Sequence, residues 1–267
     1  MRRRALLGTA STALAALAGC SVLGEEHTRD DSLTRGVPDD ATVAVDNLNG
    51  DVTVESATGA DLVAEYTVRS RASRAAVDDT TVDATVADGT VTVETTYGPD
   101  ARGHSPSVDL TVRVPDGATL NRAATGNGRV TATGVAGDAT LDAGNGRVEA
   151  TDVDGYVALA SGNGRLSATG VAGLDGASTG NGDIDVEAPA VRGDVTVESG
   201  NGDVTVRLGS GLDVAVVATT GNGDVSVEGV SLDGLETGGG RVRGRLGDGT
   251  HELGVETGNG DVAVRGL

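Results

Sequence analysis

The sequence contains no phenylalanine, no tryptophan and no lysine. The only aromatic side chains among its 267 residues are Tyr66, Tyr97 and Tyr156. A hydrophobic core must therefore be built from Val, Leu and Ala, which favours thin, regularly stacked β-structure over a thick globular core that needs aromatic side chains to fill it. This composition argues against coiled coils, helical bundles and large doubly wound folds.

Basic residues are scarce. All 20 of them are Arg, they face 40 acidic residues, and the formal net charge is -20. Nucleic acid is excluded as an expected partner, because binding phosphates needs a basic face. The self-repulsion of such a chain weakens when the Debye length falls to about 3 Å near 1 M salt. The acid excess therefore predicts a protein from a halophile.

Cysteine occurs once, as Cys20, so no disulfide can form within the chain. Residues 1–19 begin with three Arg and continue in an apolar run of small residues that is too short to span a bilayer. This order is typical of a secretion signal. Arg3 and Arg4 resemble a twin-arginine export signal, and the Leu-Ala-Gly-Cys sequence that ends at Cys20 resembles a lipobox.

The lipobox resemblance implies cleavage before Cys20 and a lipid on its thiol. The mature protein would then be exported and anchored to the outer face of the cell membrane. Residues 20–36 lack apolar periodicity and carry clustered charges, which predicts a flexible tether. Two further regions follow, a less regular strand-rich region over 37–122 and a repeat region over 123–267.

The repeat region is punctuated by Gly-Asn-Gly turns at spacings of 18, 18, 18, 20, 21, 17 and 20 residues, with Gly239 taking the seventh of eight places. A charged residue and a period-two alternation follow each turn, as in Asp203-Val204-Thr205-Val206, which is typical of half-buried strands. Such a repeat predicts a stacked architecture. The turn asparagines are Asn127, Asn145, Asn163, Asn181, Asn201, Asn222 and Asn259.

These features predict an all-β, single-stranded β-solenoid with coils of about 18–21 residues. Asn and Gly tolerate positive φ, and coils stacked about 4.8 Å apart would let the Asn side chains hydrogen-bond as a structural ladder. A series of β-hairpins is the alternative, because Asn-Gly is also the strongest hairpin turn signal. A propeller is excluded, since a blade needs about 40 residues or more.

Two kinds of repeat are present. Arg follows the turn where the second inward position is Ala, and Asp follows it where that position is Val. We therefore expect an Arg block beside an Asp block on the surface, and a core that is narrower at the Ala coils, filled from the other side by Tyr156 and Leu159. The Arg set is Arg129, Arg147 and Arg165.

Three segments carry a family resemblance. They are the alternating run from Val43 to Val54 with Asn47 and Gly50, the Val112-Arg113-Val114-Pro115-Asp116-Gly117-Ala118 segment, and the recurring Thr-Gly-Asn-Gly-Asp-Val. Over about Val37 to Leu267 the chain resembles the putative adhesin family of β-strand-repeat proteins, which are exported or membrane-tethered. The resemblance implies a right-handed β-helix-like fold and no known activity.

Catalytic signals are sparse. His27 falls in the expected tether, and His104 and His251 are far apart in the sequence. No metal-ligand spacing, nucleophile elbow or phosphate loop occurs. Solenoid lyases act through acidic and Arg residues on one face, but the sequence favours a protein that is no enzyme and has no cofactor or small-molecule substrate.

Calcium is the sharper alternative, because Gly-Asn-Gly-Asp is similar to the repeat of calcium-binding β-rolls. Here Asp follows Gly directly, and Arg takes its place in half of the repeats, where guanidinium cannot replace carboxylate. Asp183, Asp203 and Asp224 remain weak candidates for a metal site if they stack in adjacent coils. An ion- or ligand-binding sensing module at the envelope would then be the function.

The favoured function is a non-catalytic, lipid-anchored extracytoplasmic module with a structural or adhesive role. Its partners would be the membrane, through the lipid, and an unknown protein or surface. Sugar binding by stacking is disfavoured, since aromatic faces supply that contact and only three Tyr exist.

Overall fold

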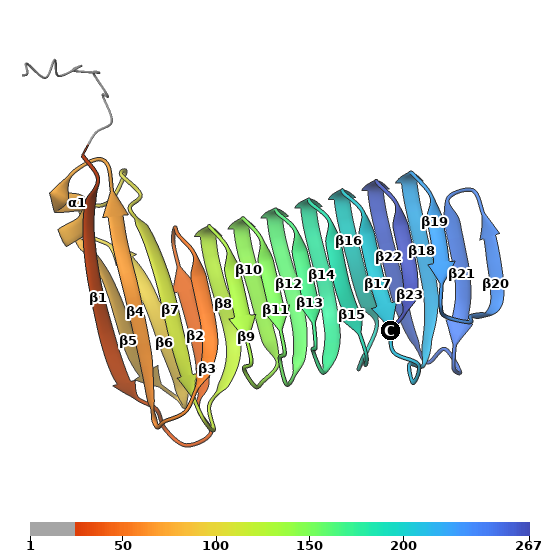
Figure 1. Cartoon of the computed structure of the whole chain (residues 1–267), viewed down its shortest axis with the longest axis horizontal. Coiled ribbons are helices and arrows are strands. Elements are labelled where there is room, and N and C mark those ends of the chain that lie inside the picture. The colour runs from red at the N-terminus through yellow and green to blue at the C-terminus, as the bar shows by residue number, and fades with distance from the viewer. Residues whose placement is uncertain (1–24) are drawn as a thin grey trace, which may run out of the picture.

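The computed structural model describes residues 25–267 and shows a rod of two β-sheets packed face to face (Figure 1). One sheet, which we call sheet A, has 11 strands, and the other, sheet B, has 12. The predicted all-β solenoid is confirmed. The expected signal over 1–19, with Arg3 and Arg4, and the lipidation residue Cys20 lie outside the described residues.

Seven strands and one short helix form the N-terminal half. Their bounds are β1 (His27–Gly36), β2 (Thr42–Asn47), β3 (Val52–Ala57), β4 (Asp61–Ser70), α1 (Arg74–Asp78), β5 (Thr80–Ala87), β6 (Thr90–Tyr97) and β7 (Ser107–Pro115). Within residues 25–267, no helix is long and apolar enough to cross a membrane.

Sixteen strands form the repeat region. They are β8 (Thr119–Asn127), β9 (Val130–Thr133), β10 (Ala139–Asn145), β11 (Val148–Thr151), β12 (Tyr156–Asn163), β13 (Leu166–Thr169), β14 (Gly173–Asn181), β15 (Ile184–Ala188), β16 (Val195–Asn201), β17 (Val204–Leu208), β18 (Val214–Asn222), β19 (Val225–Glu228), β20 (Asp233–Gly238), β21 (Arg241–Leu246), β22 (His251–Asn259) and β23 (Val262–Gly266).

In the repeat region, each coil that runs from sheet B to sheet A is one strand of sheet B, a Gly-Asn-Gly turn and one strand of sheet A. In the coil of β12 and β13, Val157 and Leu159 point into the core from one side and Leu166 and Ala168 from the other, all of them buried. Equivalent residues of neighbouring coils pair in parallel without a register shift from β9 through β11 to β13. Alternation thus places one line of aliphatic side chains above the next along the rod.

Tyr156 does not fill the core, contrary to expectation. It is half-buried on the outer face of sheet B, whereas Leu159 is 2% exposed. The two positions differ by an odd number of residues, so their side chains point to opposite faces of the strand.

Residues 27–36 form β1 rather than the second half of a flexible tether. This strand pairs antiparallel with β4 along all ten residues, and only its outer edge is free. Its side chains are exposed or half-buried, with Leu33 packed against the core. An edge strand held by backbone hydrogen bonds needs little apolar periodicity, which is why the sequence pattern did not reveal it.

The last coil is inserted into the stack instead of ending it. Strand β22 pairs with β16 on one side and β18 on the other, and β23 lies between β17 and β19. The C-terminus accordingly lies inside the rod in Figure 1, with β18 to β21 beyond it. The coil of β16 and β17 and the coil of β18 and β19 are therefore consecutive in the sequence but are separated in the rod by the coil of β22 and β23.

The two ends of the rod differ. At the N-terminal end, α1 buries Ala76 and Val77 beside β1, β4 and β5. At the other end sheet B exceeds sheet A by the antiparallel strands β21 and β20. A register shift between Asp233 and Glu236 kinks the edge strand β20, a device that discourages pairing with other edges.

Candidate functional site

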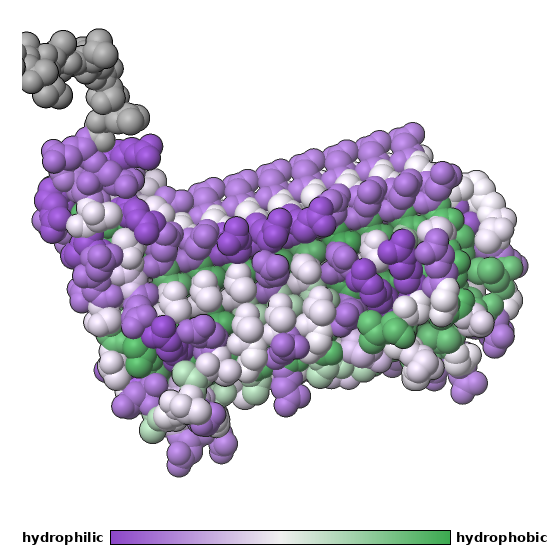
Figure 2. All heavy atoms as spheres, viewed as in Figure 1, coloured by the Kyte–Doolittle hydropathy of each residue, from purple (hydrophilic) through white to green (hydrophobic). Residues whose placement is uncertain are grey.

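The turn asparagines form one column along a rim of the rod. Six of the seven side-chain amides donate to the amide oxygen of the asparagine in the neighbouring coil, with N···O distances of 2.8–3.0 Å, and Asn127 at the end of the column accepts only. The stacking order is Asn127, Asn145, Asn163, Asn181, Asn201, Asn259 and Asn222. Figure 2 shows hydrophilic side chains in straight rows along this upper rim.

A second column, of hydroxyl groups, lies just inside the first and was missed in the sequence. A Thr or Ser two residues before the turn Asn donates to a glycine carbonyl of the adjacent coil, as Ser161 does to Gly146 at 2.8 Å. The signal was available, because Thr or Ser recurs at this place and Ala143 is the exception. The members are Thr125, Ser161, Thr179, Ser199, Thr257 and Thr220.

The residues directly after the turns form a third column, which we call the charge column. Backbone hydrogen bonds between coils give its order, because from Arg129 onward the carbonyl of each member accepts an N–H group from the coil before it. The order along the rod is Asp51, Arg129, Arg147, Arg165, Asp183, Asp203, Asp261 and Asp224. An Arg block therefore lies beside an Asp block.

The column does not place the three candidate metal ligands Asp183, Asp203 and Asp224 in adjacent coils. Asp261 separates Asp224 from Asp203, because the last coil is inserted between theirs. A carboxylate oxygen of Asp183 accepts the backbone N–H of Asp203 at 3.1 Å, and Asp203 accepts that of Asp261 at 2.8 Å. No group of three His, Cys, Asp or Glu residues within 25–267 is placed to hold a metal ion.

Gly239 is not a member of the ladder. It joins β20 to the antiparallel strand β21, so the hairpin alternative holds at this one repeat. Gly239 and Gly240 have φ angles of 59° and 71°, the pair of positive values that a tight hairpin turn requires. Arg241 consequently begins a strand of sheet B and lies outside the charge column.

The hairpin carries the most distinctive surface of the molecule, which we call the arginine groove. Arg241, Arg243 and Arg245 alternate along β21 and are exposed. Their side chains lie across the register from Thr219, Val217 and Ala215 of β18, which form the floor. Among residues 25–267, no carboxylate lies within 4.0 Å of these three guanidinium groups. The arginines that do form ion pairs are Arg69, Arg71, Arg74, Arg113, Arg122, Arg165, Arg192, Arg207 and Arg265.

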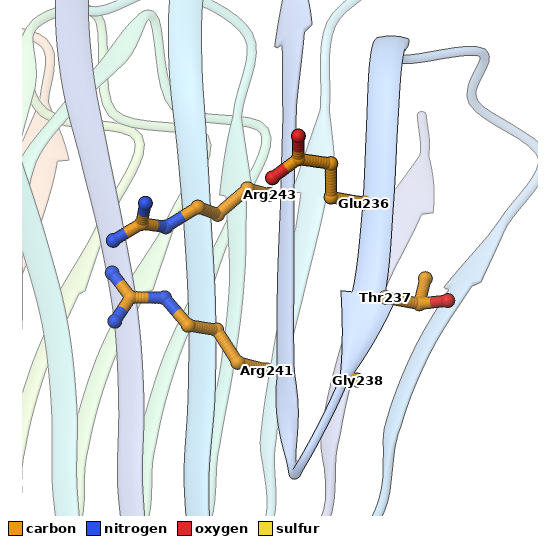
Figure 3. A pocket seen from close by; sticks show the side chains of 5 residues that line it. All are labelled: Glu236, Thr237, Gly238, Arg241 and Arg243. Carbon is orange, nitrogen blue, oxygen red and sulfur yellow. The ribbon is translucent and has the colours of Figure 1, made fainter.

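The far wall of the groove is β22. Glu252 and Glu256 lie opposite the two ends of the floor, whereas Gly254 lies opposite Val217 in the middle and leaves that row open. The hollow over these strands has a volume of about 720 Å³. In Figure 3 the side chains of Arg241 and Arg243 extend in the same direction, away from Thr237 of β20.

One known protein family matches nearly the whole described part of the chain. The Toastrack DUF4097 family matches residues 26–265. The chain belongs to the Toastrack DUF4097 family. No curated protein matches it.

Solved structures resemble the Toastrack chain at low identity. A putative adhesin from Bacteroides fragilis is 14% identical with a TM-score of 0.47, and the match covers 90% of this chain and 97% of that one. A putative cell adhesion protein from Clostridium sporogenes is 13% identical with a TM-score of 0.35, covering 90% and 100%. A "Putative lipid binding protein" from Parabacteroides distasonis is 12% identical with a TM-score of 0.38, covering 91% and 97%.

A second charged cluster of the Toastrack rod centres on Arg192. Its guanidinium forms ion pairs with Asp138 and Asp175 and lies 4.5 Å from the centre of the Tyr156 ring. The backbone N–H of Tyr156 and the Arg192 side chain lower the pKa of Asp138 below its usual value. These hydrogen bonds and ion pairs saturate the cluster, so it fixes the loop around Arg192 rather than offering free charges.

The inserted coil of the Toastrack rod is fixed at its start by Asp213. One carboxylate oxygen accepts the N–H groups of Gly249 and Thr250 at 2.5 and 3.1 Å, and the other accepts the Thr250 hydroxyl at 2.7 Å. The Thr250 hydroxyl is the main reason that the pKa of Asp213 lies below its usual value.

The three histidines are not brought together. His27 is in β1, His104 is in the loop after β6, and His251 is in β22.

Proposed function

We propose that this Toastrack protein is a non-catalytic surface module, held outside the cell membrane by a lipid on Cys20, that adheres to anionic polymers through the arginine groove. The observation that carries the proposal is the row of Arg241, Arg243 and Arg245 without carboxylate partners in a chain of formal net charge -20. Asp233, Glu236 and Glu252 line the same hollow but form no ion pair with these arginines, so the three guanidinium groups can bind an anionic ligand.

The spacing of the row suits a repeating anion. Alternate residues of a strand are about 6.8 Å apart, so the ligand needs negative charges at a similar period. Guanidinium groups bind carboxylates in a planar, bidentate way. The groove is open and its floor is Ala215, Val217 and Thr219, which offers no aromatic face for sugar stacking. An acidic polysaccharide, recognised by its carboxylates, fits these properties.

Adhesion is tested with cells or vesicles that display the anchored protein. We expect them to be retained on a surface coated with polygalacturonate and not on one coated with neutral dextran. Retention should fall at least about tenfold in R241Q/R243Q, because each guanidinium–carboxylate pair that is lost weakens binding. The matched control is R35Q/R102Q, which removes the same charge from exposed arginines outside the groove. Equal retention of both variants would contradict the groove as the binding site.

Anchoring is tested separately, by mass. The mature protein should begin at residue 20 and carry an added lipid mass, and Cys20→Ser should abolish that mass and release the protein into the medium. An unmodified thiol at Cys20 would contradict the anchor but would leave the binding property of the groove open to test on soluble protein.

A further inference from the structure

The charge column has the same period as the rod, and after Asp51 at its N-terminal end it consists of one basic and one acidic block. Arg129, Arg147 and Arg165 occupy three successive coils, and Asp183, Asp203, Asp261 and Asp224 occupy the next four. All are exposed except Asp183, which is half-buried. Neighbouring members are one strand spacing apart, about 4.8 Å, so the three Arg and the four Asp that follow them form two adjoining straight blocks of opposite charge.

We propose that two copies of this chain bind each other antiparallel along this rim. A two-fold axis between the coils of Arg165 and Asp183 places Arg165 opposite Asp183 of the second copy, Arg147 opposite Asp203 and Arg129 opposite Asp261. Each pair occurs twice, which gives six opposite-charge pairs, against two like-charge pairs of Asp51 with Asp224 at the ends of the column. The pairs stay in register over the whole block, because the same backbone spacing sets both columns.

The column contains charged groups without a partner in their own copy, which supports this pairing. Arg129 and Arg147 have no carboxylate within 4.0 Å among residues 25–267, and Arg165 reaches only Asp183. Asp203 and Asp261 each accept one backbone N–H, which engages one carboxylate oxygen and leaves the second. Stacked carboxylates also repel one another, and an opposing row of guanidinium groups relieves that repulsion.

The shape of the rim admits a partner. On the side of the charge column toward sheet B, the rim consists of Gly-Asn-Gly turns whose asparagine amides bond along the rod. The next coil excludes a side chain at the turn glycines, so asparagine is the one side chain of each turn; a Cβ on Gly146, for example, would lie 1.8 Å from the Gly128 carbonyl oxygen. Figure 2 shows the rim as straight rows.

Orientation follows from the charges. Two parallel copies in register would place Arg against Arg and Asp against Asp. Parallel copies staggered by half the column would pair one Arg block with one Asp block and leave the other two free, so that assembly would continue as an open filament. Only the antiparallel arrangement satisfies both blocks of both copies in one closed contact.

The consequence is homophilic contact between copies whose N-terminal ends point in opposite directions. If the proposed Cys20 anchor holds, this geometry suits copies on two facing membranes. Exposed ion pairs are individually weak, and tethering favours their formation because it raises the effective concentration of the two copies. The dimer itself does not depend on the anchor. It is therefore tested on the secreted Cys20→Ser form.

Two charge variants give the sharpest test. R129D/R147D makes the column almost entirely acidic, and D203R/D261R makes it mainly basic. Either alone would oppose like charges across the two-fold axis, whereas a mixture would oppose unlike charges at all six pairs. The column already accommodates both Arg and Asp in different coils, so each residue fits the rim, and circular dichroism checks the fold of each variant.

Sedimentation equilibrium is measured at the lowest KCl concentration that keeps the fold intact. We expect the parent protein to dimerise, each variant alone to dissociate at least about tenfold more readily, and the equimolar mixture to form a heterodimer. Arg35→Asp, a charge reversal outside the rim, should leave the dimer unchanged. A monomeric parent protein, assembly beyond the dimer, or a mixture that stays monomeric would overturn the proposal.

Single cysteines test the orientation. Across the two-fold axis the two copies of residue 163 are offset by about one coil, and the two copies of residue 127 by about five coils or 24 Å along the rod. Under mild oxidation Asn163→Cys should therefore form a disulfide-linked dimer and Asn127→Cys should not. Efficient cross-linking at both positions would indicate parallel copies and contradict the proposal.

Discussion

At the scale of single residues, the rim is stabilised by hydrogen bonds that repeat from coil to coil. The inner hydroxyl column has one break, at Ala143, where neighbouring coils place Thr125 and Ser161. A hydroxyl at 143 would lie in the same relation to the Gly128 carbonyl as Ser161 does to Gly146, which accepts at 2.8 Å. The break is therefore a vacant hydrogen-bonding position in the stack.

Filling that position should stabilise the protein. We expect Ala143→Ser to raise the free energy of unfolding by about 0.5–1.5 kcal/mol, the net value of one intramolecular hydrogen bond. Ser161→Ala should lower it by about 0.5–1.5 kcal/mol, because the partly buried Gly146 carbonyl loses its hydrogen-bond partner. Chemical denaturation measures both. An Ala143→Ser variant no more stable than the parent would show that the column contributes nothing to stability.

The turn glycines differ sharply in what they tolerate. Gly146 has a φ of 151°, and an added Cβ would lie 1.8 Å from the Gly128 carbonyl oxygen. Gly59 has a comparable φ of 139° but nothing within 4 Å of the same position. The pair separates the cost of backbone conformation from the cost of blocked stacking.

We expect Gly146→Ala to destabilise the fold by about 3 kcal/mol or more, since the backbone of two coils must move apart. Gly59→Ala should cost about 1–2 kcal/mol, the cost of the positive φ alone. Thermal unfolding of the two variants measures the difference. Equal losses would mean that coil contact at the turn is not the constraint we describe.

Asp213 gives the stability a pH dependence. Because its folded pKa lies below the ordinary value of 3.8, its carboxylate stabilises the fold above about pH 3.8, and this contribution is lost as the pH falls through the lowered value. We expect Asp213→Asn to be less stable than the parent at neutral pH and the difference to shrink below about pH 3.8. A difference that is constant down to acidic pH would contradict this role.

At the scale of elements, the inserted coil decides which strands are interior. Val264 of β23 is buried between β17 and β19, whereas Val227 of β19 is half-buried at the edge of sheet A. If the coils followed sequence order, the two roles would be exchanged. Truncation of each valine therefore tests the order of stacking.

We expect Val264→Ala to lower the free energy of unfolding by about 2–3 kcal/mol and Val227→Ala by about 1 kcal/mol or less. The larger loss comes from a cavity that surrounding strands cannot close. Urea denaturation provides both values. A larger loss at Val227 would contradict the inserted position of the last coil.

The elements also show how far the sequence could lead. Period-two alternation and the Gly-Asn-Gly turns predict the coils, because each coil must bury one face and reverse tightly. Their order along the rod is not predictable in this way, since Asp203-Val204 and Asp261-Val262 present the same pattern to any neighbour. Gly239 differs from the other turn residues in the sequence itself, because a glycine lacks the side-chain amide that the ladder needs.

The functional surface was harder to foresee than the fold. The alternating Arg241, Arg243 and Arg245 are visible in the sequence, but assigning them to the solenoid repeat concealed their grouping on the outer face of sheet B. Whether these arginines form a binding surface depends on the residues beside them, which are the small floor residues of β18 and Gly254 of β22. The inserted coil brings these residues together.

At the scale of the whole molecule, the protein is a rod with two distinct charged surfaces. The arginine groove is at one end on the outer face of sheet B, and the charge column runs along the rim. The surfaces share no residue, so a variant in one leaves the other intact. Binding of an anionic polymer and contact between two copies are therefore separable properties of the same rod.

The central claim, that the arginine groove binds a carboxylate polymer, is tested most directly by titration calorimetry. Polygalacturonate is titrated into the secreted Cys20→Ser form, into R241Q/R243Q and into the control R35Q/R102Q. We predict saturable binding to the parent and control, with affinity at least about tenfold weaker in R241Q/R243Q. No binding to the parent protein, or equal affinity for the groove variant and the control, would contradict the account.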